Sequence, residues 1–228
     1  MKLFLCGGGS GKQIIDSLKR FSEEINKSKP ILYIPLAMES KKYDSCKSWF
    51  EGEIKNIGVV DFDMVTSSEE LSNKDLEKYS AIFIGGGNTY KLLGELKQHS
   101  NIKKIDQYLK NGGVVFGGSA GAIIFGKNID CCLFEDENLI NLKDCDGFNY
   151  LNNISLLCHL DNKHLEKNKD YLIKCSNKNK IIYLPEEDVI FVNDGNIELI
   201  GKEEYILFSD GKYNFHNYLD IKDDIDNK

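Results

Sequence analysis

Short runs of apolar residues alternate with longer amphipathic stretches along the first half of the chain. A short apolar run bounded by turn residues predicts a buried strand, and apolar residues recurring every three or four positions predict a helix. The predicted strands are 3–6, 31–35, 59–65, 81–84 and 114–116. The predicted helices are 13–26, 43–57, a helix carrying Leu92, Leu93 and Leu96, and 102–109.

Alternating strands and helices predict an α/β fold with three layers and a mainly parallel central sheet. After residue 150 the pattern changes to short strands, predicted at 154–158, 181–184, 189–192, 197–200, 205–208 and 213–215. Turn residues at 193–196 and 210–211 indicate hairpins. We therefore expect an antiparallel edge added to the same sheet within a single domain, 1–218, followed by a polar, frayed tail, 219–228.

Composition narrows the class of protein. Of the 228 residues, 41% are hydrophobic, enough for a substantial core, and the net charge of −7 gives no support for nucleic-acid binding. No apolar run is long enough for a membrane span, and the apolar start, 1–6, is too short for a signal peptide. Seven cysteines without a C-x-x-C pair predict reduced thiols, no metal site and a cytoplasmic location.

The segment 117–121 carries the clearest chemical signal. It reads G-x-S-x-G and directly follows the predicted strand 114–116. A serine on a tight turn between a strand and a helix is a nucleophile elbow, which makes Ser119 the candidate nucleophile. The following helix is predicted from Ala120 to about Gly126. The amide of Ala120, at its start, is suited to stabilising an oxyanion. The alternative is a glycine-rich loop with an incidental serine.

A serine nucleophile needs a base within hydrogen-bond reach. His159 immediately follows the predicted strand 154–158, where the carboxyl ends of strands are expected to converge. His164, in a charged run that predicts a helix, is the rival. His99 and His216 lie in less suitable segments.

The base needs an orienting acid. Glu186 follows Pro185 directly after the predicted strand 181–184, again at a strand end. A solvated acidic turn is the alternative interpretation of this segment. Four other acids compete for the role: Asp130, Glu135, Asp136 and Asp161.

Two further glycine-rich turns follow predicted strands. The first, 85–89, reads G-G-G-N-T, so an amide of Gly86 or Gly87 is a candidate second oxyanion donor, while Asn88 or Thr89 could instead cap a helix. The second, 7–13, is similar to a phosphate-binding P-loop but has Cys6 and Gln13 at two required positions. A turn lining the same cleft is the better interpretation of 7–13.

The ordered set of motifs resembles the serine peptidases of family S51, which include aspartyl dipeptidase (peptidase E) and cyanophycinase. The resemblance rests on 85–89, on G-G-S-A-G-A at 117–122, on His159 after a strand, and on L-P-E at 184–186. The segment 146–151 is also similar. The likeness runs in order over about residues 3–200.

This resemblance implies a fold like that of class I glutamine amidotransferases and a Ser-His-Glu triad that needs no metal or cofactor. Ser119 would be the nucleophile, His159 the base and Glu186 its orienting acid. Gly86 or Gly87 would supply oxyanion amides with Ala120, and Asn88 and Thr89 would contact the substrate.

The implied substrate is a small peptide, such as a dipeptide with N-terminal Asp or a β-aspartyl bond. The family places an arginine near the histidine segment for the acidic side chain, whereas Arg20 is the only arginine here and lies on the first helix. The candidate replacements are Lys163, Lys167 and Lys169. The alternative function is an inactive family member that binds a small metabolite or peptide. A monomer and a homodimer are both compatible with the sequence.

Overall fold

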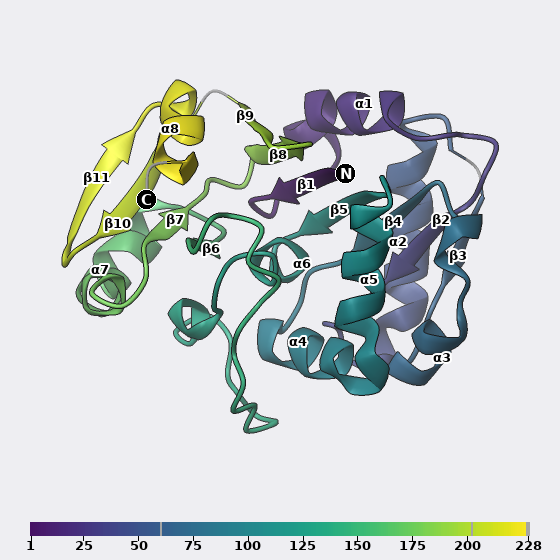
Figure 1. The fold of residues 1–228 in the computed structure, drawn as a ribbon, viewed down its shortest axis with the longest axis horizontal. Helices are drawn as coiled ribbons and strands as arrows, with labels where there is room; N and C mark the ends of the chain where they lie inside the picture. Colours follow the sequence, from purple (N-terminus) through teal and green to yellow (C-terminus); the bar gives the residue numbers. More distant parts are fainter. Residues whose placement is uncertain (60, 202, 227–228) are drawn as a thin grey trace.

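Two sheets organise the chain in a computed structural model that describes residues 1–59, 61–201 and 203–226 (Figure 1). Strands β1 to β11 are Lys2–Cys6, Ile31–Ile34, Phe62–Met64, Ala81–Ile84, Val114–Gly118, Ser155–Leu157, Ile181–Tyr183, Val189–Asn193, Asn196–Ile200, Tyr205–Ser209 and Lys212–His216. Helices α1 to α8 are Ile15–Glu23, Tyr43–Lys55, Ser68–Asn73, Thr89–Lys97, Asn101–Lys110, Ala120–Ile123, Asn162–Ser176 and Ile221–Asp226. The larger sheet has the strand order β3-β2-β4-β5-β1-β8-β9, and the smaller has β11-β10-β7-β6.

The larger sheet forms the middle of three layers, as the sequence predicts. Its strands β3, β2, β4, β5 and β1 are parallel, and β8 and β9 continue it in antiparallel pairing. Successive side chains of β1 point to opposite faces of the sheet and so join different parts of the core. Phe4 joins the aromatic cluster under α1 and α2, whereas Leu3 and Leu5 join the cluster under α4 and α5. Figure 1 shows α2 behind this sheet and α5 in front of it.

The parallel arrangement determines where a site can form. Strands β1, β2, β4 and β5 all run in the same direction, so their carboxyl ends lie along one edge of the sheet. The segments 7–9, 85–88 and 119 follow β1, β4 and β5 at that edge. Open parallel sheets bind their ligands beyond such an edge.

The second half of the chain differs from its prediction in one respect. Only β8 and β9 extend the main sheet, whereas β6, β7, β10 and β11 form the separate four-stranded sheet at the left of Figure 1. Within it β6 and β7 are parallel, with α7 crossing between them. The prediction of one continuous antiparallel edge was therefore wrong. The core nevertheless runs through both sheets without a break, since Leu5 of the large sheet and Tyr183 of the small one belong to one cluster.

The predicted elements of the first half are present with shifted ends. The third strand is shorter than 59–65, and Val60 lies outside the described residues. Helix α3 has no counterpart in the prediction. Helix α6 ends at Ile123, although the pattern suggested a helix to about Gly126.

The end of the chain is also more ordered than expected. The predicted frayed tail instead forms α8, in which Ile221 and Ile225 are buried. Residues 227 and 228 of that tail lie outside the described residues.

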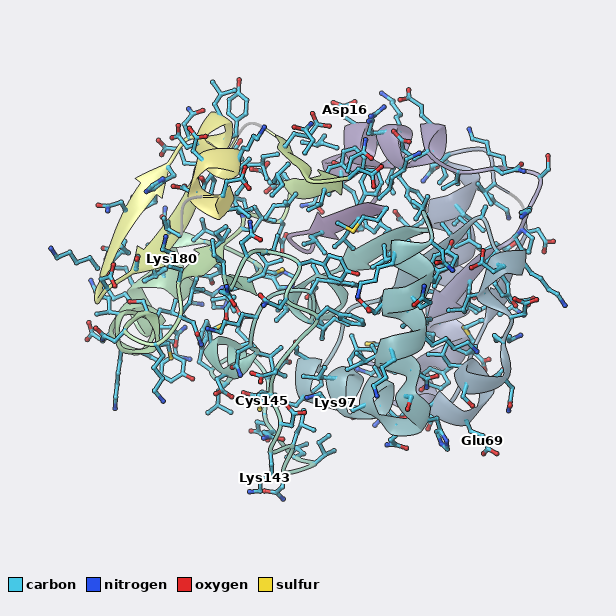
Figure 2. All side chains as sticks on the ribbon, viewed as in Figure 1. Asp16, Glu69, Lys97, Lys143, Cys145 and Lys180 are labelled. Atoms are coloured by element: carbon cyan, nitrogen blue, oxygen red, sulfur yellow. The ribbon has the colours of Figure 1, made fainter. Side chains whose placement is uncertain are left out.

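One loop projects from the body between α6 and β6. Figure 2 shows Lys143 at its outer end and Lys97 of α4 near its base. An ion pair of 2.6 Å between Lys97 Nζ and Asp144 Oδ2 ties the loop to α4. In the described part of the chain, no helix combines the length and apolarity needed to cross a membrane.

Candidate active site

Ser119 lies between β5 and α6 in a conformation that side-chain-bearing residues rarely adopt. Its backbone angles are φ 50° and ψ −113°, which places it in the left-handed half of conformational space. The first and last glycines of the motif are required by space: a Cβ on Gly117 would lie 2.2 Å from the carbonyl oxygen of Gly121, and one on Gly121 would lie 2.2 Å from that of Ile84. This is the strained strand-to-helix turn that the G-x-S-x-G motif predicts.

The side chains of Ser119, His159 and Glu186 form a continuous hydrogen-bonded chain. Ser119 Oγ lies 2.7 Å from His159 Nε2, and His159 Nδ1 lies 2.8 Å from Glu186 Oε1. Each side chain comes from a different strand end, since they follow β5, β6 and β7 respectively. A hydroxyl that contacts an imidazole, which in turn contacts a carboxylate, is the geometry of a nucleophile with an oriented base.

The rival residues have other partners. His164 Nδ1 contacts the carboxylate of Asp161, and the same carboxylate caps the start of α7. Asp136 Oδ2 accepts a hydrogen bond of 2.9 Å from the Thr89 amide. None of these contacts involves Ser119 or His159.

The glycine-rich turn after β1 supports the histidine and the glutamate. The Gly7 carbonyl accepts a hydrogen bond of 2.9 Å from the His159 amide, and the Gly9 amide donates one of 2.8 Å to the Glu186 carbonyl. Gly8, at φ 126°, lies against the imidazole, where an added Cβ would be 2.1 Å from His159 Cε1. The amides of Gly7 and Gly9 are thus bonded within the chain, which favours a cleft-lining turn over a phosphate loop.

The candidate oxyanion donors lie beside Ser119. A Cβ on Gly86 would be 3.1 Å from Ser119 Cβ, so this turn lies against the candidate nucleophile. Within the described ranges, the amides of Gly86, Gly87 and Ala120 form no hydrogen bond with the chain. They are therefore available to an oxygen atom bound next to Ser119.

Asn88 and Thr89 have structural roles. The Asn88 side chain caps α4 by accepting from the Lys91 amide at 2.8 Å and donates to the Glu137 carbonyl at 2.9 Å. Thr89 is fully buried. The helix-cap interpretation of this turn is thus confirmed for Asn88, and neither residue lines the cavities described next.

Two cavities meet at Ser119, and the residues common to both linings are Gly87, Ser119 and His159. The first, of about 520 Å³, lies toward α2 and is lined by Tyr33, Trp49, Phe83 and Phe116 among others. We call it the aromatic cavity. The second, of about 540 Å³, lies toward α7, and its lining includes Glu135, Asp136, His164 and Lys167. We call it the charged cavity.

Glu135 has the most perturbed carboxyl group of the charged cavity. Desolvation of the carboxyl and the negative charges of Asp136 and Asp161 raise the pKa of Glu135 to about 8, against an opposing hydrogen bond from Tyr183. The side chain as a whole keeps exposed surface, so we attribute the desolvation to its carboxyl end. A bound cation would lower this pKa, because an opposite charge favours the carboxylate.

Other groups near the site show no sign of direct chemistry. Burial raises the pKa of the Cys6 thiol to about 12 and that of Cys158 well above its usual value, so both remain protonated. Across the described ranges, no group of three or more His, Cys, Asp or Glu residues could hold a metal ion.

The sequence prediction missed the aromatic cavity. Trp49 was assigned to a helix, and Phe116 to a buried strand, because their spacing is equally typical of a core. The lysines near His159 were recognised as candidates, but the sequence could not select among them. The structure places Lys167 in the lining of the charged cavity, whereas Lys163 and Lys169 are absent from that lining.

Comparison with known proteins identifies the family. The model for peptidase family S51 matches residues 3–200. Peptidase E of Haemophilus influenzae is 32% identical over 104 residues, 45% of this chain and 46% of that protein. Peptidase E of Escherichia coli is 25% identical over 227 residues, 93% of this chain and 95% of that protein.

A solved structure of a peptidase from an acI-B1 actinobacterium is similar in fold, with a TM-score of 0.73 at 18% identity over 94% of this chain and 93% of that one. At this identity the likeness supports the fold alone, and it confirms the predicted architecture. The family match confirms the predicted enzyme class, a serine-type peptidase. The chain therefore belongs to peptidase family S51.

Proposed function

We propose that this protein hydrolyses small peptides through an acyl-enzyme formed on Ser119. The observation that carries the proposal is the hydrogen-bonded chain from Ser119 through His159 to Glu186, at 2.7 and 2.8 Å, on a strained turn beside free backbone amides. Strain of this kind persists where the surrounding structure enforces it, and it is concentrated at functional sites.

In the first half of the reaction, Ser119 Oγ attacks the peptide carbonyl carbon while its proton passes to His159 Nε2. Glu186 holds the imidazole by Nδ1 and stabilises the imidazolium that forms. The carbonyl oxygen becomes an oxyanion, which the amide of Ala120 and that of Gly86 or Gly87 stabilise. The C–N bond then breaks, and His159 gives its proton to the leaving amine.

In the second half, water enters the place that the amine has left. His159 removes a proton from the water, which attacks the acyl carbon. Collapse of the second tetrahedral intermediate returns the proton to Ser119 Oγ and releases the carboxylate product.

The charged cavity supports a substrate with a charged N-terminal residue. Asp136 offers negative charge for an α-ammonium group, which would also lower the raised pKa of Glu135 and so favour its carboxylate. Lys167 offers a cation for an acidic side chain. Lys167 forms no ion pair with any described residue, while Lys169 pairs with Glu166 at 2.9 Å. Lysine lacks the bidentate fork of arginine, so the discrimination in favour of aspartate should be modest.

The alternative is an inactive member of the family that only binds a metabolite or peptide. The contact between the serine hydroxyl and the imidazole favours the enzyme, because binding alone requires no base beside a strained serine.

The test is hydrolysis of Asp-Ala, β-Asp-Ala and Ala-Ala by wild type and by Ser119→Ala, together with fluorophosphonate labelling. We expect hydrolysis and labelling by the wild type, and a loss of about 10⁶-fold in kcat in the variant. Equal turnover by both proteins, or absence of labelling in the wild type, would exclude Ser119 as the nucleophile.

The proposed substrate preference is tested by a matched pair of variants. Lys167→Ala should lower kcat/KM for Asp-Ala relative to Ala-Ala by about tenfold, roughly 1.4 kcal/mol. Lys163→Ala removes the same charge from the same helix outside the cavity lining and should leave the ratio unchanged. A similar loss in both variants would assign the effect to general electrostatics.

A further inference from the structure

From Ser119, the aromatic cavity extends to residues of α2, and the charged cavity extends to residues of α7. They share only Gly87, Ser119 and His159 among the described lining residues. A peptide whose carbonyl carbon is at Ser119 Oγ therefore extends one residue into each cavity. If the proposed function holds, the charged N-terminal residue occupies the charged cavity, and the residue that leaves with the amine faces the aromatic cavity.

The aromatic cavity is rigid at its base. Phe83 and Phe116 stack with ring centroids 4.8 Å apart, and Tyr33 stacks on Phe50 at 4.2 Å. The rings of Tyr33, Phe83 and Phe116 are at most 5% exposed, so packing fixes them in place. A ligand that enters meets a preformed apolar surface and does not have to order it.

Trp49 is the exposed member of this surface. Its side chain on α2 is 40% exposed, although its ring centroid lies only 6.1 Å from that of Phe83. Part of this large apolar residue, at a cavity beside Ser119, therefore remains in contact with water. An apolar side chain that covered it would gain about 25 cal/mol for each Å² removed from water.

The charged groups of the aromatic cavity also favour an uncharged side chain over an acidic one. Glu53 lines it and accepts a hydrogen bond of 2.9 Å from the Gly11 amide. The described lining contains no lysine or arginine to pair with an acidic side chain. An acidic side chain inserted into this cavity would therefore face Glu53 without a compensating cation.

We propose that the aromatic cavity receives the side chain of the leaving residue, that it selects large apolar and especially aromatic side chains, and that Trp49 is the specificity-determining contact. The substrate class is then a small peptide with a charged N-terminal residue followed by an aromatic or large aliphatic one. This inference rests on the proposed function for the direction of the peptide.

The test keeps the first residue constant and varies the second: Asp-Phe, Asp-Leu, Asp-Gly and Asp-Glu. For the wild type we expect kcat/KM to be about tenfold or more higher for Asp-Phe than for Asp-Gly, and lowest for Asp-Glu. Trp49→Ala should reduce the ratio of Asp-Phe to Asp-Gly to within about threefold. Leu219→Ala truncates a 72% exposed side chain far from the cavity and should keep the wild-type ratio.

A second measurement is independent of turnover, because Trp49 is the only tryptophan of the chain. In Ser119→Ala, Asp-Phe should change the tryptophan fluorescence saturably, and Asp-Gly at the same concentration should not. Hydrolysis of the whole series at equal rates, with no difference in fluorescence, would overturn the cavity proposal and leave the proposed function intact. A saturable fluorescence change with Asp-Phe but no hydrolysis by the wild type would support the cavity and count against the peptidase mechanism.

Discussion

At the scale of single residues, the conformation of Ser119 separates stability from function. Its backbone angles, φ 50° and ψ −113°, lie in a region that glycine adopts without strain but that is strained for any residue with a Cβ, such as serine. A residue held in such a region costs the fold about 1–3 kcal/mol. In the same conformation the Ser119 hydroxyl lies 2.7 Å from His159 Nε2.

This strain predicts opposite effects of one substitution on stability and activity. Ser119→Gly should abolish hydrolysis and yet be more stable than Ser119→Ala by about 1 kcal/mol, since relief of strain exceeds the roughly 0.5–1 kcal/mol that glycine loses in chain entropy. For a chain of this size we expect a rise in Tm of about 2–4 °C over Ser119→Ala. A lower Tm for the glycine variant would show that the turn is not strained.

At the scale of elements, the turn between β1 and α1 positions His159, the proposed general base. Gly8 at φ 126° lies against the His159 ring, and its neighbours Gly7 and Gly9 bond to the segments that carry His159 and Glu186. This turn contributes no reacting group. Its part is to fix where the imidazole lies.

Gly8→Ala therefore tests positioning. The new Cβ would lie 2.1 Å from His159 Cε1, so the ring must move, and we expect kcat/KM to fall by about 10²-fold. Gly112→Ala is the matched control, because Gly112 has φ 93° but open space around an added Cβ. Both variants should lose about 1–2 kcal/mol of stability from backbone strain, and only Gly8→Ala should lose activity. Equal activity in the two would remove the positioning role.

Local patterns explain which elements could be predicted. Strands β1, β4 and β5 are short apolar runs that end in glycine-rich turns, and Ser119, His159 and Glu186 each come just after a short apolar strand. Helix α3 escaped prediction because S-E-E-L-S-N has only Leu71 as an apolar residue, too little for a helical period. The contacts among the three site residues were inferable from the convergence of strand ends, and their catalytic roles stay a proposal.

At the scale of the whole molecule, contacts between segments distant in sequence determine features that local sequence patterns could not predict. The pairing of β6 with β7 within a second sheet depends on α7 crossing between them, and the strand sequences alone are equally typical of an extended first sheet. The aromatic cavity gathers Trp49, Phe83 and Phe116 from α2, β4 and β5. The local sequence around each of these residues predicts only that its side chain is buried in the core.

Helix α8 joins the two sheets, although its sequence, I-K-D-D-I-D, suggests a solvated end. Asp224 contacts the Tyr205 hydroxyl of β10 and lies 2.7 Å from His216 Nδ1 at the end of β11. Ile221 and Ile225 are each 1% exposed and belong to the cluster that spans both sheets. Two apolar residues four positions apart provide one buried face of a short helix.

We therefore expect the end of the chain to be required for the stability of the whole fold. Ile225→Ala should lower the free energy of unfolding by about 2–5 kcal/mol, because it removes buried methylene groups and leaves a cavity between the sheets. Lys222→Ala, on the exposed side of the same helix, should change stability by less than about 0.5 kcal/mol. Thermal unfolding of the two variants measures the difference. Since Ile225 lies outside the linings of both cavities, hydrolysis by Ile225→Ala well below its Tm should match the wild type. If Ile225→Ala instead melted at the wild-type Tm, the helix would not be packed on the core as the structure has it.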